Sequence, residues 1–203
     1  MKKLILSSCI LLFLMLCSCA STKIVNSWME PNKEITINKL KKVLVVAMFN
    51  NETSNHKAED QMVSYLEGKG IPSYNYLNNS FDKTRVEAIQ NKIKKDGFDG
   101  AVTMRLIDVD KETLYQKNGL NRYPNNYRDF SNYYYDSSIS YNNPENYVTT
   151  KTYTIETNIY SITENKIIWS ALTETTDPKG VKKLTEEVSK VVYKQMLKDG
   201  FIK

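Results

Sequence analysis

Three apolar segments in the first half of the chain have the length and composition of β-strands. The run 43–49 is rich in β-branched residues and shows no alternation, which is typical of a strand covered on both faces, as in a parallel sheet. Shorter apolar segments at 71–77 and 101–109 predict a second and a third strand.

Apolar positions recur at helical spacing between these strands. After the polar loop 50–55 a helical stripe runs toward Gly70, and Asn55 is its expected N-cap. A second helix is predicted over 83–96, with Asp82 as its N-cap and Phe81 packing on Val86. Strands and helices that alternate with connections of this length are typical of parallel crossovers.

The pattern changes in the middle of the chain. Residues 116–148 contain seven of the fourteen tyrosines, with Asn, Ser and two prolines, and show neither a helical nor a strand period. A long segment of this kind is predicted to be a loop that is either functional or disordered.

Regular patterns return after this segment. Alternation over 153–162 predicts a strand, and a tight turn leads into an antiparallel strand over 166–175. A cap at Asp177 and a proline at 178 are expected to open the last helix. Gly200 ends it, and Phe201 and Ile202 are predicted to fold back onto the core.

Together these segments predict one α/β domain over residues 41–203, in the order β-α-β-α-β-β-β-α. The sheet is expected to be mixed, with helices packed on it in a three-layer arrangement and the Tyr-rich insertion 116–148 before the final hairpin. Residues 19–40 are polar and predict a tether, with Trp28 packing at the edge of the domain.

The N-terminal segment has a pattern of its own. A basic start and an apolar run too short for an ordinary transmembrane helix predict a secretory signal over residues 1–18. Its ending, Leu16-Cys17-Ser18-Cys19, resembles the lipobox of bacterial lipoproteins, which has Leu three residues before an obligatory Cys and a small residue directly before it. That resemblance implies cleavage after Ser18, a diacylglyceryl group on Cys19 and an acylated new N-terminus.

A lipid anchor of this kind predicts attachment to a membrane. Several acyl chains bury many methylene groups at about 0.8 kcal/mol each, which makes anchoring stable. Ala20 follows the cysteine, where an aspartate would resemble an inner-membrane retention signal. We therefore expect an outer-membrane protein that faces the periplasm. The other two cysteines leave with the signal, so no disulfide is expected.

The net charge of the chain bears on whether it binds nucleic acid. The formal net charge of +5 falls to 5 − 2 = +3 when Lys2 and Lys3 are removed with the signal, and acidic and basic residues are interspersed. A balance of this kind favours solubility and does not indicate a nucleic-acid partner.

Three short phrases carry a resemblance to a known group. They are the segment 42–51 with its polar loop, Gly97-Phe98-Asp99-Gly100-Ala101-Val102 entering a strand, and 165–170 after a turn. Together they resemble the small α/β domain of envelope proteins such as the TolB N-terminal domain, LpoB and CsgG, and above all outer-membrane lipoproteins of Gram-negative bacteria. The resemblance covers about residues 41–202, implies an α/β fold and transfers no catalytic residue. The Tyr-rich segment has no counterpart in those proteins.

Few residues offer reaction chemistry. His56 is the only histidine, and a solvated place in a loop or first helical turn is favoured over a role as general base. We interpret Glu59 and Asp60 as acids favouring a helix N-terminus, and Asp108 and Asp110 as solvated residues where a strand ends. One histidine without a free cysteine argues against zinc, and no glycine-rich turn for a nucleotide follows the first strand. We therefore expect no enzyme activity, metal or cofactor.

Tyrosine is the one residue type in clear excess. Its apolar ring and polar hydroxyl suit a protein contact or stacking on sugars. The alternative is that the tyrosines reflect general composition and the loop simply packs on the sheet. The candidate binding residues, beside Arg122, are Tyr123, Tyr127, Arg128, Tyr133, Tyr134, Tyr135, Tyr141 and Tyr147.

These observations lead to one expected function and one alternative. We expect a non-enzymatic, lipid-anchored periplasmic protein that binds an envelope protein partner. The alternative is a peptidoglycan- or glycan-binding lipoprotein that uses the same Tyr-rich segment.

Overall fold

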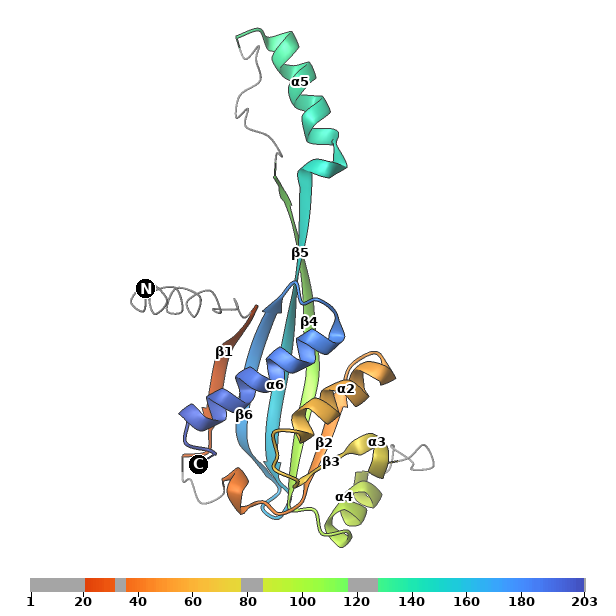
Figure 1. The fold of residues 1–203 in the computed structure, drawn as a ribbon, viewed down its shortest axis with the longest axis vertical. Coiled ribbons are helices and arrows are strands. Elements are labelled where there is room, and N and C mark those ends of the chain that lie inside the picture. The colour runs from red at the N-terminus through yellow and green to blue at the C-terminus, as the bar shows by residue number, and fades with distance from the viewer. Residues whose placement is uncertain (1–20, 32–35, 78–85, 117–127, 203) are drawn as a thin grey trace, which may run out of the picture.

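A six-stranded mixed sheet forms the centre of the protein, in the order β1-β6-β5-β4-β2-β3 (Figure 1). The computed structural model describes residues 21–31, 36–77, 86–116 and 128–202. Strand β2 runs parallel to β3 and β4, and the remaining pairs are antiparallel. The strands are β1 (Thr22–Met29), β2 (Val43–Met48), β3 (Gly70–Pro72), β4 (Gly100–Tyr115), β5 (Tyr147–Ser161) and β6 (Lys166–Thr176).

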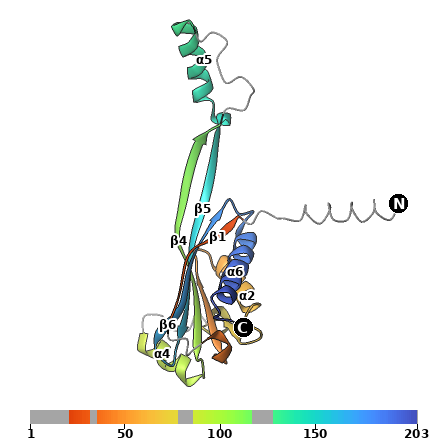
Figure 2. The ribbon, with the colours of Figure 1, turned by 90° about the vertical axis from the view of Figure 1, so that its left-hand side faces the viewer.

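Helices lie on both faces of the sheet. α2 and α6 cover one face, and α4 lies on the other face at the end away from α5 (Figure 2). The α-helices are α2 (Glu52–Val63), α3 (Ser73–Tyr76), α4 (Val86–Lys95), α5 (Phe130–Asn142) and α6 (Val181–Lys198), with 3-10 turns η1 (Ile37–Lys39) and η2 (Pro144–Asn146). The predicted α/β class and mixed sheet are confirmed. The predicted element order is found from β2 to α6, with α3 and α5 added to it.

The main core lies between the sheet and the two helices α2 and α6. Trp169 of β6 and Phe201 are fully buried there, and their ring centroids are 6.2 Å apart. Gly200 has a φ of +72°, a conformation that glycine adopts without strain, and it reverses the chain after α6. The predicted return of Phe201 and Ile202 to the core is confirmed.

The predicted tether is wrong for residues 22–29, which form the edge strand β1. β1 pairs antiparallel with β6, and Thr22 lies opposite Thr175. The Glu187 carboxylate of α6 holds the start of β1, because it accepts hydrogen bonds from Ser21 Oγ at 2.6 Å and Thr22 Oγ1 at 3.0 Å. The segment has little alternation of its own, so its pairing with β6 and its contact with α6 decide its structure.

This carboxylate predicts an effect of acid on β1. Burial alone would raise the pKa of Glu187, but the hydrogen bonds from Ser21 and Thr22 and the charge of Lys183 outweigh it and lower the pKa. A lowered carboxyl pKa adds stability above the unfolded-state pKa, and that stability is lost as pH falls through the folded-state value. Below about pH 4 we therefore expect faster hydrogen exchange in β1 relative to β5. In the control variant Glu187→Gln this pH dependence should be absent. An equal pH dependence in the variant and the unmodified protein would contradict the role of Glu187 in holding β1.

The strand predicted over 71–77 is also corrected. β3 ends at Pro72, and the next four residues form the helical turn α3. The Glu59 carboxylate accepts hydrogen bonds from the backbone N–H groups of Ser73 at 2.7 Å and Tyr74 at 3.3 Å. Because these two donors point at Glu59, the chain turns where the apolar pattern predicts more strand.

The start of α2 lies four residues before its predicted place. Asn51 is the N-cap, and its Oδ1 accepts a hydrogen bond from Ser54 N at 3.1 Å. Asn55, the predicted cap, lies within the helix and accepts a hydrogen bond from Phe49 N at 2.7 Å. Asn51 therefore caps the helix, whereas Asn55 ties it to the residue that follows β2.

The last helix also begins later than predicted. α6 starts at Val181 after Gly180, while Asp177 accepts a hydrogen bond from Lys151 N of β5 at 2.7 Å. The cap and staple predicted for the second helix, Asp82 and Phe81, lie outside the described residues.

Candidate functional site: an aromatic tip on a two-stranded arm

Strands β4 and β5 continue beyond the other strands as a two-stranded arm. The last pair between β5 and β6 is Thr152–Thr176, whereas the β4–β5 ladder continues to Tyr115–Tyr147. We call residues 110–115 and 147–152 the arm, and residues 128–146 the tip. Figure 1 shows the arm projecting from the body with α5 at its end. The strands predicted over 101–109 and 153–162 miss this extension because no layer covers the arm and its sequence has no apolar face.

The tip is helical where the sequence predicts an irregular loop. Asp129 caps α5, since its Oδ1 accepts hydrogen bonds from Ser131 N at 2.9 Å and Asn132 N at 3.1 Å. No residue of α5 is buried. At helical spacing Phe130 and Tyr134 share one side and Ile139 lies on another, so large side chains occur around the helix. A helix without a core-facing stripe leaves no period to detect, which is why residues 116–148 gave no helical signal.

Three tyrosines join the tip to the arm. The rings of Tyr115, Tyr141 and Tyr147 lie with centroids 5.4 to 6.0 Å apart. Tyr147 Oη donates a hydrogen bond to the Tyr141 carbonyl oxygen at 2.8 Å, and the hydroxyls of Tyr115 and Ser140 are 2.8 Å apart. Burial between these rings, followed by the neighbouring Tyr141, raises the pKa of Tyr147. Two predicted binding residues, Tyr141 and Tyr147, thus hold the tip in place, and Tyr115 was missed because the predicted strand stops too early.

The other described tyrosines of the tip point to solvent. Tyr134 and Tyr135 are each 65% exposed and Phe130 is 78% exposed, with Tyr133 and Ile139 also exposed. Arg128 begins the described part of the tip, whereas Tyr123 and Tyr127 lie outside the described residues. Large apolar side chains gathered at one exposed place are typical of an interaction surface. The structure therefore leaves Tyr133, Tyr134 and Tyr135 exposed on α5 and adds Phe130 and Ile139, which the count of tyrosines alone did not reveal.

A cleft of about 790 Å³ lies at the carboxyl end of β2, a place where ligands often bind in α/β sheets. The His56 ring packs on Tyr74 with centroids 4.0 Å apart, and its Nε2 is 3.9 Å from a Glu52 carboxylate oxygen. Glu59 also borders the cleft but is only 1% exposed. Ala47 N and Ser73 Oγ donate to its Oε1 at 2.9 and 2.8 Å, in addition to the two bonds to Oε2 described above.

The interpretation of Glu59 and Asp60 as acids at a helix start is wrong. Both lie in the second half of α2, and Glu59 joins that helix to β2 and to α3. With four donors on its two oxygens, Glu59 has a structural role. Within the described ranges no three His, Cys, Asp or Glu side chains are placed to hold a metal ion. No helix in this part of the chain is long and apolar enough to cross a membrane.

The hydroxyl of Tyr74 predicts a spectroscopic signature for this cleft. Its hydrogen bond to Asp60 at 2.6 Å, with a smaller contribution from burial, raises the pKa of Tyr74 to about 12. A raised pKa favours the neutral phenol of the folded state, an advantage that is complete below the unfolded value and lost as pH rises through about 12. Asp60→Asn should therefore shift one tyrosinate absorbance step to lower pH. The Tyr74→Phe variant should lack that step; an unchanged titration in Asp60→Asn would refute the contact.

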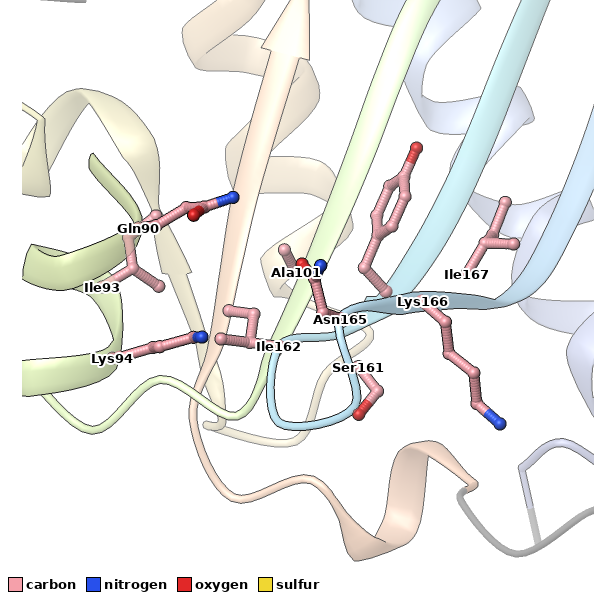
Figure 3. Close-up of a pocket in the computed structure, with 10 residues that line it drawn as sticks. Gln90, Ile93, Lys94, Ala101, Ser161, Ile162, Asn165, Lys166 and Ile167 are labelled. Atoms are coloured by element: carbon pink, nitrogen blue, oxygen red, sulfur yellow. The ribbon is translucent and has the colours of Figure 1, made fainter. Parts of the chain in front are cut away.

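A second groove lies on the opposite face of the sheet, between α4 and the β5–β6 turn (Figure 3). Its volume is about 480 Å³, and Ile93, Ala101 and Ile162 are among the residues that line it. Polar side chains, among them Gln90, Lys94 and Lys166, also line the groove, and no predicted site residue lies in it.

Comparisons with known proteins give structural likeness only. No protein-family model matches the chain, and no curated protein matches its sequence. The PelC dodecamer from Paraburkholderia phytofirmans is similar over 85% of this chain and 95% of its own, with 9% identity and a TM-score of 0.45. Lipoprotein GNA1162 from Neisseria meningitidis is similar over 77% of this chain and 98% of its own, with 12% identity and a TM-score of 0.39. Neither sequence comparison links the chain to TolB, LpoB or CsgG.

Proposed function

We propose that this chain is a lipid-anchored protein of the bacterial outer membrane, facing the periplasm, that works by binding an envelope protein through the tip of its arm. The observation that carries this proposal is the exposure of Phe130, Tyr134, Tyr135 and Ile139 on a helix held away from the body.

The arm gains little stability from contacts within the protein, which favours a role in binding a partner. A two-stranded ribbon is only marginally stable alone in water, and here it ends in a helix with no buried residue. The Tyr115–Tyr141–Tyr147 cluster fixes the helix on the ribbon, so the large side chains are presented in a defined arrangement. Preorganised aromatic side chains lower the entropic cost of binding.

The composition of α5 favours a protein partner. Its thirteen residues include four tyrosines, four serines and two asparagines. This is the combination found in antibody binding loops, where tyrosine supplies rigid contact area and serine and asparagine supply adaptable hydrogen bonds. The ring faces of the same tyrosines could also stack on sugars, which keeps glycan binding as the alternative.

The proposal of a lipid anchor rests on the lipobox-like sequence Leu16-Cys17-Ser18-Cys19. Replacing Cys19 by alanine should move the protein from the membrane fraction to the soluble fraction, because the acyl chains supply the membrane affinity. Mass spectrometry of the full-length protein from its own cells should show a diacylglyceryl group at Cys19. A free thiol there would end the proposal of a lipid anchor.

The tip part of the proposal is tested by in-cell cross-linking. In one variant a short Gly-Ser turn replaces residues 117–146, leaving the Tyr115–Tyr147 pair in place. A defined cross-linked protein should be lost in this variant but kept in the control Leu197→Ala, an exposed position at the far end of α6. Retention on isolated peptidoglycan that Tyr134→Ala with Tyr135→Ala abolishes would support glycan binding instead.

A further inference from the structure

The proposed anchor and the arm leave the body at the same end of the sheet. The Ser21 carbonyl oxygen accepts a hydrogen bond from Thr176 N at 3.1 Å, and Thr176 pairs with Thr152, where the arm begins. Ser21 Oγ is also bound to Glu187 of α6, so this point is fixed to the body from two sides. In Figure 1 the start of β1 lies at the base of the arm.

The link from this fixed point to the membrane is very short. Only Ala20 lies between Ser21 and Cys19, so an extended link from Ser21 to the proposed lipid attachment spans roughly 7 Å. The sequence predicted a tether of 19–40, which would have let the domain stand away from the membrane. Because 22–29 form β1, the arm end of the sheet must face the bilayer at close range.

The arm is much longer than this link. Six residues of each strand extend the ribbon by roughly 20 Å, and the thirteen residues of α5 have a length of roughly 20 Å. Both ribbon views show α5 continuing in the general direction of the arm (Figures 1 and 2). The tip therefore reaches about 30 to 40 Å beyond the base of the arm, a distance comparable with the thickness of a bilayer.

Bare lipid does not suit this arm. In hydrocarbon every backbone polar group must be paired within the protein, and the two strands of the arm have no further strand on their outer edges among the described residues. Helices that lie in the membrane surface have Lys or Arg on their polar face, and α5 has neither. A protein surface can pair these backbone groups and receive the tyrosines.

We infer that the tip binds a protein embedded in the membrane that holds the lipid anchor. This inference rests on the proposed function, because it needs both a lipid on Cys19 and a partner for the tip. The partner presents its binding surface toward the anchored face of the domain, and the short link sets the depth at which the arm meets it.

A photo-crosslinking amino acid at position 134 tests this inference in the full-length protein in its own cells, with the same amino acid at position 197 as the control. Tyr134 lies on the tip and Leu197 in the last turn of α6 on the body, and both are exposed. We expect a product from position 134 only, and its partner should stay in the membrane after an alkaline carbonate wash.

A helical spacer of about 40 residues between Ala20 and Ser21 then tests the geometry. It lifts the body by about 60 Å, more than the reach of the arm. The yield of the position 134 product should fall about tenfold or more, with an unchanged melting temperature showing that the body is folded.

The outcomes separate the two levels of the proposal. No product above the level of the control position ends both the proposed function and this inference. A product with a partner that the carbonate wash releases, or one that persists with the spacer, overturns the inference while the binding function of the tip stands. Labelling of lipid alone also overturns it.

Discussion

Replacing Trp169 by alanine is expected to lower the free energy of unfolding by about 4 kcal/mol. Trp169 is fully buried, stacks on Phe201, and its Nε1–H donates a hydrogen bond to Asp199 Oδ2 at 3.0 Å. The substitution therefore leaves a large cavity and removes the hydrogen-bond donor for Asp199. Urea denaturation followed by far-ultraviolet circular dichroism measures the change.

The matched control for Trp169 is the second tryptophan. Trp28 is 43% exposed on the edge strand β1, so Trp28→Ala should change the same free energy by less than about 1 kcal/mol. Trp169→Phe keeps much of the side-chain volume, so its loss in free energy of unfolding should lie between those of Trp169→Ala and Trp28→Ala. Similar losses for Trp169→Ala and Trp28→Ala would contradict the described core.

Replacing Glu59 by alanine is expected to cost about 3 to 5 kcal/mol, although the residue is charged and lies on a helix. The substitution removes the acceptor for the N–H groups of Ala47, Ser73 and Tyr74 at the junction of β2, α2 and α3. Buried donors without an acceptor are costly, and several lose theirs at once. The same denaturation experiment measures the effect.

Two substitutions separate this effect from a loss of charge. Glu59→Gln keeps one acceptor oxygen and the volume, so it should cost less than Glu59→Ala. Asp60→Ala removes the neighbouring carboxylate, which makes one hydrogen bond at the surface to Tyr74, and should cost less than about 1 kcal/mol. An equal effect at positions 59 and 60 would show that charge, rather than the buried contacts, matters.

The position of the arm shows why part of the candidate site could not be predicted. The tyrosine excess drew attention to 116–148, but a helix exposed on all sides has no amphipathic period, and the arm strands have no buried face to impose alternation. The roles of individual tyrosines also depend on pairing. Tyr141 and Tyr147 meet Tyr115 only because the β4–β5 ladder brings residues 115 and 147 together.

Sequence by itself determined the α/β class, the parallel and antiparallel parts of the sheet, and the return of Phe201 to the core. A buried strand or an amphipathic helix places its apolar residues at a regular local spacing, so the sequence pattern alone predicts the element. Tertiary structure alone decided that 22–29 are a strand, that Glu59 is a buried junction, and that the arm leaves the body beside the start of β1. These features depend on partners far away in sequence, such as β6 for β1 and Ser73 for Glu59, and no local pattern encodes a distant partner.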